Sequence, residues 1–160
     1  MHKQLLTAFL LIAFSAGVSH EVRAQANPNQ LISARKGAMT LQAKYFGPVL
    51  AMSLGRAPYD PKIVQRNVEY LAVLNQMPWE DFQPHTAGNP NTRAKEDIYK
   101  DPAKFKAALD KGQAEVQKLL KVVRDGGDQN SVKPAAQAVG RACNSCHEEF
   151  ATFDFRFRVD

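Results

Sequence analysis

The sequence has very little cysteine: two residues in a chain of 160, at positions 143 and 146. A disulfide between them would close a loop of only a few residues, which removes little conformational entropy from the unfolded chain. Small exported domains that depend on disulfides carry many more cysteines than this. The pair is therefore a poor candidate for a stabilising crosslink, and another use for it has to be sought.

A long apolar run is also missing. The one apolar stretch near the start, Leu5 to Val18, is too short to span a bilayer comfortably. It follows the basic start Met1-His2-Lys3 and precedes Val22-Arg23-Ala24, which has the form of a signal-peptidase site. We predict that residues 1–24 are a removed secretory signal and that residues 25–160 form one domain in the periplasm, without a membrane anchor.

No strong excess of one charge is present. The formal net charge is +5, and loss of the predicted signal would bring it to about +4. The basic residues are spread along the chain and do not alternate with aromatic residues as in a nucleic-acid-binding stripe. Nucleic acid is therefore not an expected partner.

Helical patterns are abundant instead. Asp60-Pro61 and Asp101-Pro102 each place a good N-cap before a proline in the first helical turn. Apolar residues at helical spacing follow each pair, up to Leu74 in the first case and to Val123, before Gly126-Gly127, in the second. These patterns predict two amphipathic helices.

Two further helices are expected at the ends of the domain. The first carries an apolar stripe from Leu31 to Leu50, and Gly47-Pro48 should kink or split it. The last begins near Ser131, has Pro134 in its first turn and reaches Phe150. The prediction is an all-α fold, an antiparallel four-helix bundle.

Two segments do not fit the helical pattern. The connection from Pro78 to Lys100 contains Pro84, Gly88 and Pro90 and is expected to be a true loop, packed down by Trp79 and Phe82. The C-terminal segment 153–160 alternates aromatic and charged residues, which predicts an extended conformation.

The last helix carries the motif Cys143-Asn144-Ser145-Cys146-His147, the C-x-x-C-H haem-attachment pattern. On a helix, residues three and four positions apart share one face. Two thiols on that face can bond the two vinyl groups of one porphyrin, and the imidazole of His147 then lies beside the iron. The motif predicts one covalent haem c, held by Cys143 and Cys146 and ligated by His147.

Three other uses of these residues were weighed. A redox dithiol normally stands at the start of a helix in a βαβ context, whereas this motif is late in an all-helical chain. A zinc site needs about four ligands, and the predicted mature chain adds only His85. The third alternative is a disulfide beside a surface histidine. Haem attachment agrees better with export, with the spacing and with the lack of further cysteine.

The second axial ligand of the iron is not fixed by the motif. The candidates are His85, Met39, Met52 and Met77. Met39 lies in the apolar stripe of the first helix, where antiparallel packing would place it opposite the last helix. A methionine in such a stripe is also ordinary core filler, so topology alone leaves both roles open.

At this point the chain resembles the cytochrome c′ family of four-helix-bundle cytochromes, over essentially the whole predicted mature chain. The residues that carry the resemblance, in order, are Met39-Thr40-Leu41, Phe46-Gly47, Gly55 to Asp60, Asn67-Val68, Leu74, Pro78-Trp79, Phe82, Phe105 and Val139-Gly140.

The resemblance implies several site residues. The family residue at the position of Met39 packs over the open face of the haem, and some bundle relatives use a methionine there as a sixth ligand. Arg35 corresponds to a family arginine that pairs with a haem propionate, and Lys36 stands where a glutamine is usual. Ala151 stands where many members of the family have a basic residue, four positions after the axial histidine and close to the haem face that this histidine ligates. The resemblance also implies a possible homodimer through the first two helices.

Two functions remain after this reading. The first is electron transfer with periplasmic redox partner proteins, with Met39 coordinating or covering the iron. The alternative is a five-coordinate haem that binds nitric oxide or carbon monoxide, with Met39 and Phe46 as steric gates. An enzyme is not expected, because the only acid pair beside the motif, Glu148 and Glu149, should face solvent.

Overall fold

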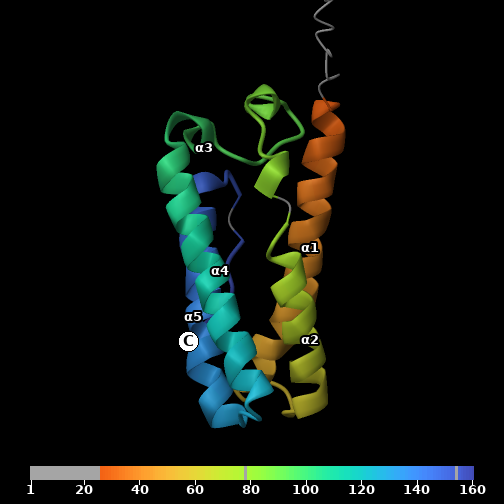
Figure 1. Cartoon of the computed structure of the whole chain (residues 1–160), viewed down its shortest axis with the longest axis vertical. Helices are drawn as coiled ribbons and strands as arrows, with labels where there is room; N and C mark the ends of the chain where they lie inside the picture. Colours follow the sequence, from red (N-terminus) through yellow and green to blue (C-terminus); the bar gives the residue numbers. More distant parts are fainter. Residues whose placement is uncertain (1–25, 78, 154) are drawn as a thin grey trace, which may run out of the picture.

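Four long helices form an antiparallel bundle in the computed structural model (Figure 1), which describes residues 26–77, 79–153 and 155–160. The long helices are α1 (Pro28–Ser53), α2 (Pro61–Leu74), α4 (Pro102–Arg124) and α5 (Gln129–Phe150). The predicted fold class is confirmed. The predicted signal, residues 1–24, lies outside the described residues.

Each long helix begins at an Asn or Asp whose side chain accepts a hydrogen bond from the first turn. The acceptors are Asn27 for α1, Asp60 for α2, Asp101 for α4 and Asp128 for α5. Such caps satisfy backbone N–H groups that have no partner within the helix. In α1, α2 and α4 a proline follows the cap directly, so the Asp-Pro signals correctly located two helix starts.

Of the two outcomes predicted at Gly47-Pro48, a kink or a split, the split is wrong, because the helix continues unbroken to Ser53. A proline restricts the preceding residue partly through a clash with its Cβ atom, and Gly47 has none. Phe46, Val49 and Leu50 are all buried around the proline, so packing holds the helix together there. The start of α5 also differs slightly, since it lies at Gln129 rather than near Ser131.

The hydrophobic core runs along the bundle axis and takes residues from all four helices. Its most deeply buried members include Phe46, Val49, Val64, Val68, Val116, Leu119, Val132 and Val139. The turn between α4 and α5 uses Gly126 at φ +82°, a backbone conformation that favours glycine. A tight turn here lets α5 return antiparallel to α4.

The long connection between α2 and α4 crosses one end of the bundle. It contains two 3₁₀ turns, Trp79–Asp81 and Pro84–Thr86, and the short helix α3 (Asp97–Lys100). As expected, Trp79 and Phe82 pack it down: their rings stack with centroids 6.0 Å apart, and both contact Phe105 of α4. Phe105 in turn contacts Phe150 of α5.

The segment after α5 is extended, as its alternation predicted, and it turns back along the bundle between α1 and α5 (Figure 1). Ala151 forms an isolated antiparallel bridge with Ala94 of the long connection. None of the helices in the described part of the chain is long and apolar enough to cross a membrane.

Candidate haem site

Helix α5 places the motif residues on one side, as the three-and-four spacing requires. Cys143, Cys146 and His147 all line a single cavity of about 530 Å³ between the helices. Both thiols are free, so no disulfide competes for them. Within the described residues no group of three or more His, Cys, Asp or Glu side chains is placed to hold a metal ion.

The walls of the cavity are largely apolar. Met39 and Phe46 line it from α1, Leu71 from α2, and Phe105 and Leu109 from α4. Trp79 and Phe82 of the long connection also line it. The size and the lining are typical of a pocket for a large, mostly apolar ligand.

The two thiols are poorly suited to redox exchange as a dithiol. Burial raises the pKa of Cys143 to about 12, and the neighbouring Cys146 adds to that effect. Burial, followed by the charge of Glu149, raises the pKa of Cys146 to about 11. Reactive dithiols depend on a lowered thiolate pKa, so this environment disfavours the redox alternative.

The imidazole of His147 has an environment suited to a metal ligand. Burial lowers its pKa, as does the positive charge of Arg156, while the nearby carbonyl of Phe155 acts in the opposite direction. The neutral ring that results is the form that binds metals. Its Nδ1 atom is buried and has no partner within hydrogen-bond distance.

Comparison with known proteins gives a consistent answer. A family model described as cytochrome C′ matches residues 30–151. Cytochrome c′ of Rubrivivax gelatinosus is 39% identical over 123 residues, which cover 77% of this chain and 95% of that protein. The chain belongs to the cytochrome c′ family. The proteins of this family are non-enzymatic haem proteins with covalent haem c.

Solved structures of cytochromes c′ agree with this assignment. The crystal structure of the Rubrivivax gelatinosus protein superposes with a TM-score of 0.75 at 38% identity, covering 79% of this chain and 98% of that one. A ferrous variant of cytochrome c prime from Alcaligenes xylosoxidans with bound nitric oxide gives 0.74 at 33% identity, covering 82% and 100%. The bundle is therefore that of a cytochrome c′.

The residues present fit the haem of a cytochrome c′. Two unpaired thiols and a neutral imidazole with an unpartnered buried nitrogen face one cavity large enough for a porphyrin. Among Met39, Met52, Met77 and His85, only Met39 lines that cavity. Met52 packs beside the core, Met77 is 41% exposed, and His85 Nε2 lies 3.1 Å from the Ala26 carbonyl oxygen.

Arg35 and Lys36, the two residues assigned through the resemblance to cytochromes c′, also line the cavity. Lys36 is exposed, whereas Arg35 is only 4% exposed. The Arg35 guanidinium donates hydrogen bonds to Thr86 Oγ1 at 3.1 Å and Thr92 Oγ1 at 2.8 Å, and it lies over the Phe82 ring. In this structure Arg35 therefore holds the long connection against α1.

A negative partner for Arg35 is missing, since no ion pair involves it within the described ranges of the chain. Arg35 lowers the pKa of Asp81, but burial, followed by the charge of Glu80, outweighs it and raises that pKa. Buried charges are normally paired. A propionate at this cytochrome c′ site would supply the missing charge.

The sequence reading missed several site residues. Phe153, Phe155 and Phe157 of the C-terminal segment line the cavity, and the rings of Phe153 and Phe155 lie 5.5 and 5.9 Å from that of His147. Their alternation predicted an extended segment, but nothing local indicates its partner. Glu148 and Glu149 face away from the cavity and pair with Arg156 and Lys104.

Proposed function

We propose that this protein is an exported c-type cytochrome that carries electrons in the periplasm. One haem c would be bonded to Cys143 and Cys146, with His147 as an axial ligand. The observation that carries the proposal is the convergence of both thiols and the imidazole on one apolar cavity. A haem held there supplies an iron that changes between the ferric and ferrous states.

The chain's own residues would shape this chemistry. The neutral imidazole of His147 would bind the iron from α5, and Met39 would stand on the α1 side of the same cavity. A thioether ligand raises the reduction potential relative to a second imidazole. Arg35 and Lys36 would neutralise the haem propionates, Arg35 through its planar fork and Lys36 as a point charge.

A second candidate function is the binding of a diatomic gas. Two variants of one relative, cytochrome c prime from Alcaligenes xylosoxidans, have solved structures with nitric oxide bound. Met39 and Phe46 give the α1 side of the cavity in this chain an apolar lining. In this case Met39 would not coordinate, and with Phe46 it would limit which molecules enter. Both candidates need the same attachment residues and differ only in the role of Met39.

The optical spectrum of the ferrous protein separates the two functions. Coordination by Met39 predicts sharp, split low-spin bands that carbon monoxide leaves unchanged, and Met39→Ala should convert them to high-spin bands. Met77→Ala, an exposed methionine outside the cavity, is the matched control. High-spin bands that shift with carbon monoxide in the unchanged protein would favour gas binding. Absence of bound haem by mass spectrometry would overturn both.

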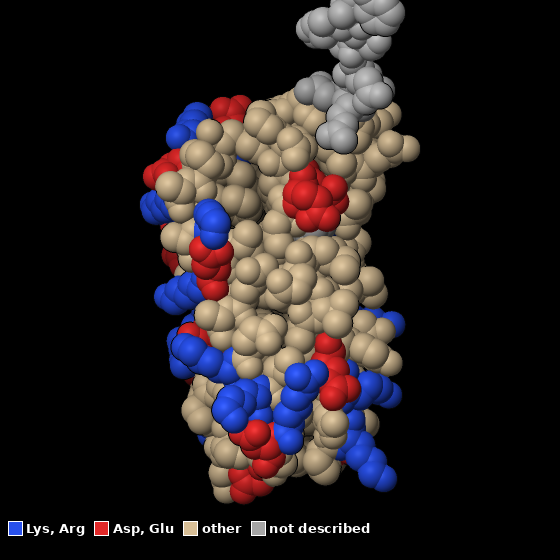
Figure 2. Space-filling view, in the orientation of Figure 1, with Lys and Arg blue, Asp and Glu red and all other residues tan. Residues whose placement is uncertain are grey.

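Partners follow from the surface. On the face in Figure 2, Lys, Arg, Asp and Glu side chains are mixed at the lower end and along the left edge, and the middle of the face is largely uncharged. This pattern supports transient redox partner proteins rather than nucleic acid. Export through residues 1–24 and a periplasmic location remain part of the proposal.

The proposed function also includes a homodimer that forms through α1 and α2. Leu41 of α1 and Tyr70 and Val73 of α2 are exposed although they are large and apolar, and Tyr70 contacts Tyr45 across the two helices. Val73 is 61% exposed. An apolar patch of this kind on paired helices is typical of an interface.

A further inference from the structure

The C-terminal segment after α5, described for residues 152–153 and 155–160, lies beyond the part of the chain that matches the family model, which ends at residue 151. Two backbone hydrogen bonds fix its start to the long connection. Thr152 N donates to the Arg93 carbonyl oxygen at 2.8 Å, and Lys95 N donates to the Phe150 carbonyl oxygen at 2.9 Å. The C-terminal segment therefore begins at an anchored turn.

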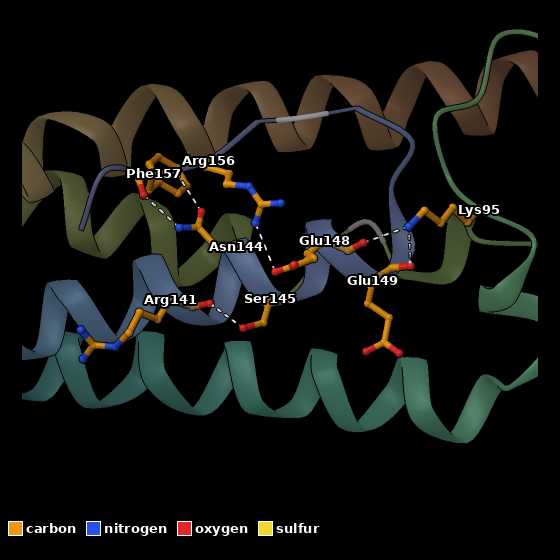
Figure 3. Close-up of polar contacts among 8 residues, drawn as sticks. All are labelled: Lys95, Arg141, Asn144, Ser145, Glu148, Glu149, Arg156 and Phe157. Atoms are coloured by element: carbon orange, nitrogen blue, oxygen red, sulfur yellow. Dashed lines mark hydrogen bonds and ion pairs between the residues drawn. The ribbon is translucent and has the colours of Figure 1, made fainter. Parts of the chain in front are cut away.

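Farther along, the C-terminal segment is hydrogen-bonded to the side of α5 (Figure 3). Phe157 N donates to Asn144 Oδ1 at 2.8 Å, and Asn144 Nδ2 donates to the Phe157 carbonyl oxygen at 2.9 Å. Asn144 lies between the two cysteines of the haem-attachment motif. Its side-chain amide pairs with both backbone groups of one residue, as a neighbouring strand would, and so ties the C-terminal segment to the motif itself.

The last residues are held from two sides. Gln137 Nε2 of α5 donates to the Val159 carbonyl oxygen at 2.7 Å, and the Arg56 guanidinium donates to the Arg158 carbonyl oxygen at 2.8 Å. Val159 lies over Gly140 of α5, where an added Cβ atom would approach Val159 Cγ1 to 2.5 Å. The absence of a side chain at Gly140 thus leaves the space that Val159 fills.

The extended conformation sends alternate side chains in opposite directions. Phe153, Phe155 and Phe157 line the cavity, whereas Arg156 and Arg158 are exposed. The C-terminal segment therefore presents an apolar side to the cavity and a charged side to solvent. This is the pattern of a layer that separates an apolar space from water.

The cavity wall that these rings form is the one beside His147. The ring centroids of Phe153 and Phe155 lie 5.5 and 5.9 Å from that of the imidazole. The Phe157 ring meets Phe46 of α1 edge to face, with centroids 4.7 Å apart. Phe155 is 37% exposed although it lines the cavity, so its ring belongs to the outer wall.

The physical effect of such a wall depends on water. The apolar shell around a metal site controls the access of solvent and the local dielectric, and through them the reduction potential. Ferric haem carries one more positive charge than ferrous haem, and water stabilises a charge better than an apolar environment does. A wall that keeps water out therefore favours the ferrous state and raises the reduction potential.

We propose that the C-terminal segment is a latched cover on the His147 side of the haem cavity, which excludes water and raises the reduction potential. This inference rests on the proposed haem site. Phe153, Phe155 and Phe157 are the cover, since their rings form the wall. Asn144 is a positioning residue, because it acts on the cavity through the backbone of Phe157.

Two variants of the holoprotein remove the cover in different ways. Asn144→Ala deletes the latch without changing either cysteine or His147, and a chain ending at Thr152 lacks all three rings. Ser145→Ala is the matched control, because Ser145 is the other residue between the cysteines and its hydroxyl donates to the Arg141 carbonyl oxygen within α5. Bound haem is measured first, by mass spectrometry, in all four proteins.

The first readout is limited trypsin digestion, which detects a detached cover because Arg156 and Arg158 lie within it. Proteolysis of a segment that opens transiently follows the population of the open form. Loss of the two hydrogen bonds of Asn144 should make cleavage after these arginines roughly tenfold faster, whereas Ser145→Ala should be cleaved like the unchanged protein. An unchanged cleavage rate in Asn144→Ala overturns the latch.

The second readout is the reduction potential, which a purely structural role of the C-terminal segment would not move. Both variants should have a lower potential than the unchanged protein and Ser145→Ala, by about 59 mV for each tenfold change in the ferric-to-ferrous preference. An equal or higher potential in the chain ending at Thr152 overturns the inference, and Asn144→Ala decides in the same way if the shorter chain does not retain haem. Absence of haem from the unchanged protein would instead overturn the proposed function itself.

Discussion

Arg35 makes several of the hydrogen bonds that hold the long connection in place. Besides Thr86 and Thr92, its guanidinium reaches the Tyr99 hydroxyl and the Asp81 carbonyl oxygen, both at 3.3 Å. Five donors in a rigid fork make this possible, and a lysine ammonium cannot copy the geometry. The same residue would face a propionate, so positioning of the connection and binding of the cofactor are combined in one group.

Arg35→Ala should lower the free energy of unfolding of the holoprotein by about 2–4 kcal/mol, because it leaves buried acceptors unpaired. Arg35→Lys should recover only a small part. Urea denaturation measures the loss, and limited trypsin digestion should show faster cleavage after Arg93 and Lys95. The exposed Lys133→Ala should stay within about 0.5 kcal/mol of the unchanged protein. An equally mild effect of Arg35→Ala would contradict this role.

At the scale of the element, the helix starts capped by an Asp, those of α2, α4 and α5, place a negative charge beside the first turn in addition to the hydrogen bonds. Asp128 caps α5 by accepting from Ser131 N at 2.9 Å and from Ser131 Oγ at 2.8 Å. These hydrogen bonds from Ser131, led by the backbone one, lower the pKa of Asp128. A carboxyl with a lowered pKa in the folded state contributes stability above its unfolded pKa and loses it as the pH falls through the folded value.

Asp128→Asn should therefore remove part of the acid sensitivity while keeping the cap, since asparagine is an equally good N-cap. Between pH 5 and 2 the unchanged protein should lose stability more steeply than the variant, because its unfolded state takes up the extra proton in that interval. Urea midpoints measured across the interval give the comparison. Parallel curves for the two proteins would show that the carboxylate charge has no such effect.

The elements differ in how well the sequence could predict them. Starts such as Asp60-Pro61 and the motif Cys143 to His147 are local signals, so reading a few residues was enough. The unbroken course of α1 through Pro48 depends on the missing Cβ of Gly47 and on buried neighbours, which a proline rule ignores. The place where the C-terminal segment packs depends on Asn144 and Gly140 in α5, and no local pattern encodes such a contact.

For the whole molecule, the unpartnered apolar surface of α1 and α2 is the clearest sign of self-association. Val73→Glu would place a carboxylate in the proposed interface, where burial of an unpaired charge is strongly unfavourable. The unchanged holoprotein should be a dimer by light scattering and the variant a monomer with the same optical spectrum. Gln117→Glu, an exposed change on α4, should remain dimeric. A monomeric unchanged protein would remove this part of the proposal.

The cavity has a consequence for folding of the entire bundle. An unfilled apolar space in a core costs stability, and the cavity of about 530 Å³, which is partly open to solvent, is lined mostly by apolar side chains. A chain without haem should therefore lose roughly several kcal/mol of stability. Single domains have a total stability of about 5–15 kcal/mol. The helices can form without the cofactor, because their caps and apolar faces are encoded locally, but the fixed packing around the cavity then lacks most of its support.

Cys143→Ser combined with Cys146→Ser should therefore yield a haem-free chain that keeps its far-ultraviolet circular dichroism, loses the near-ultraviolet signal and binds the dye ANS. Ser145→Ala changes an exposed hydroxyl in the same motif and should retain haem and a cooperative thermal transition. If the haem-free variant instead unfolds cooperatively at the temperature of the holoprotein, the four helices close the cavity unaided. The haem would then contribute little to the stability of a core that is already complete.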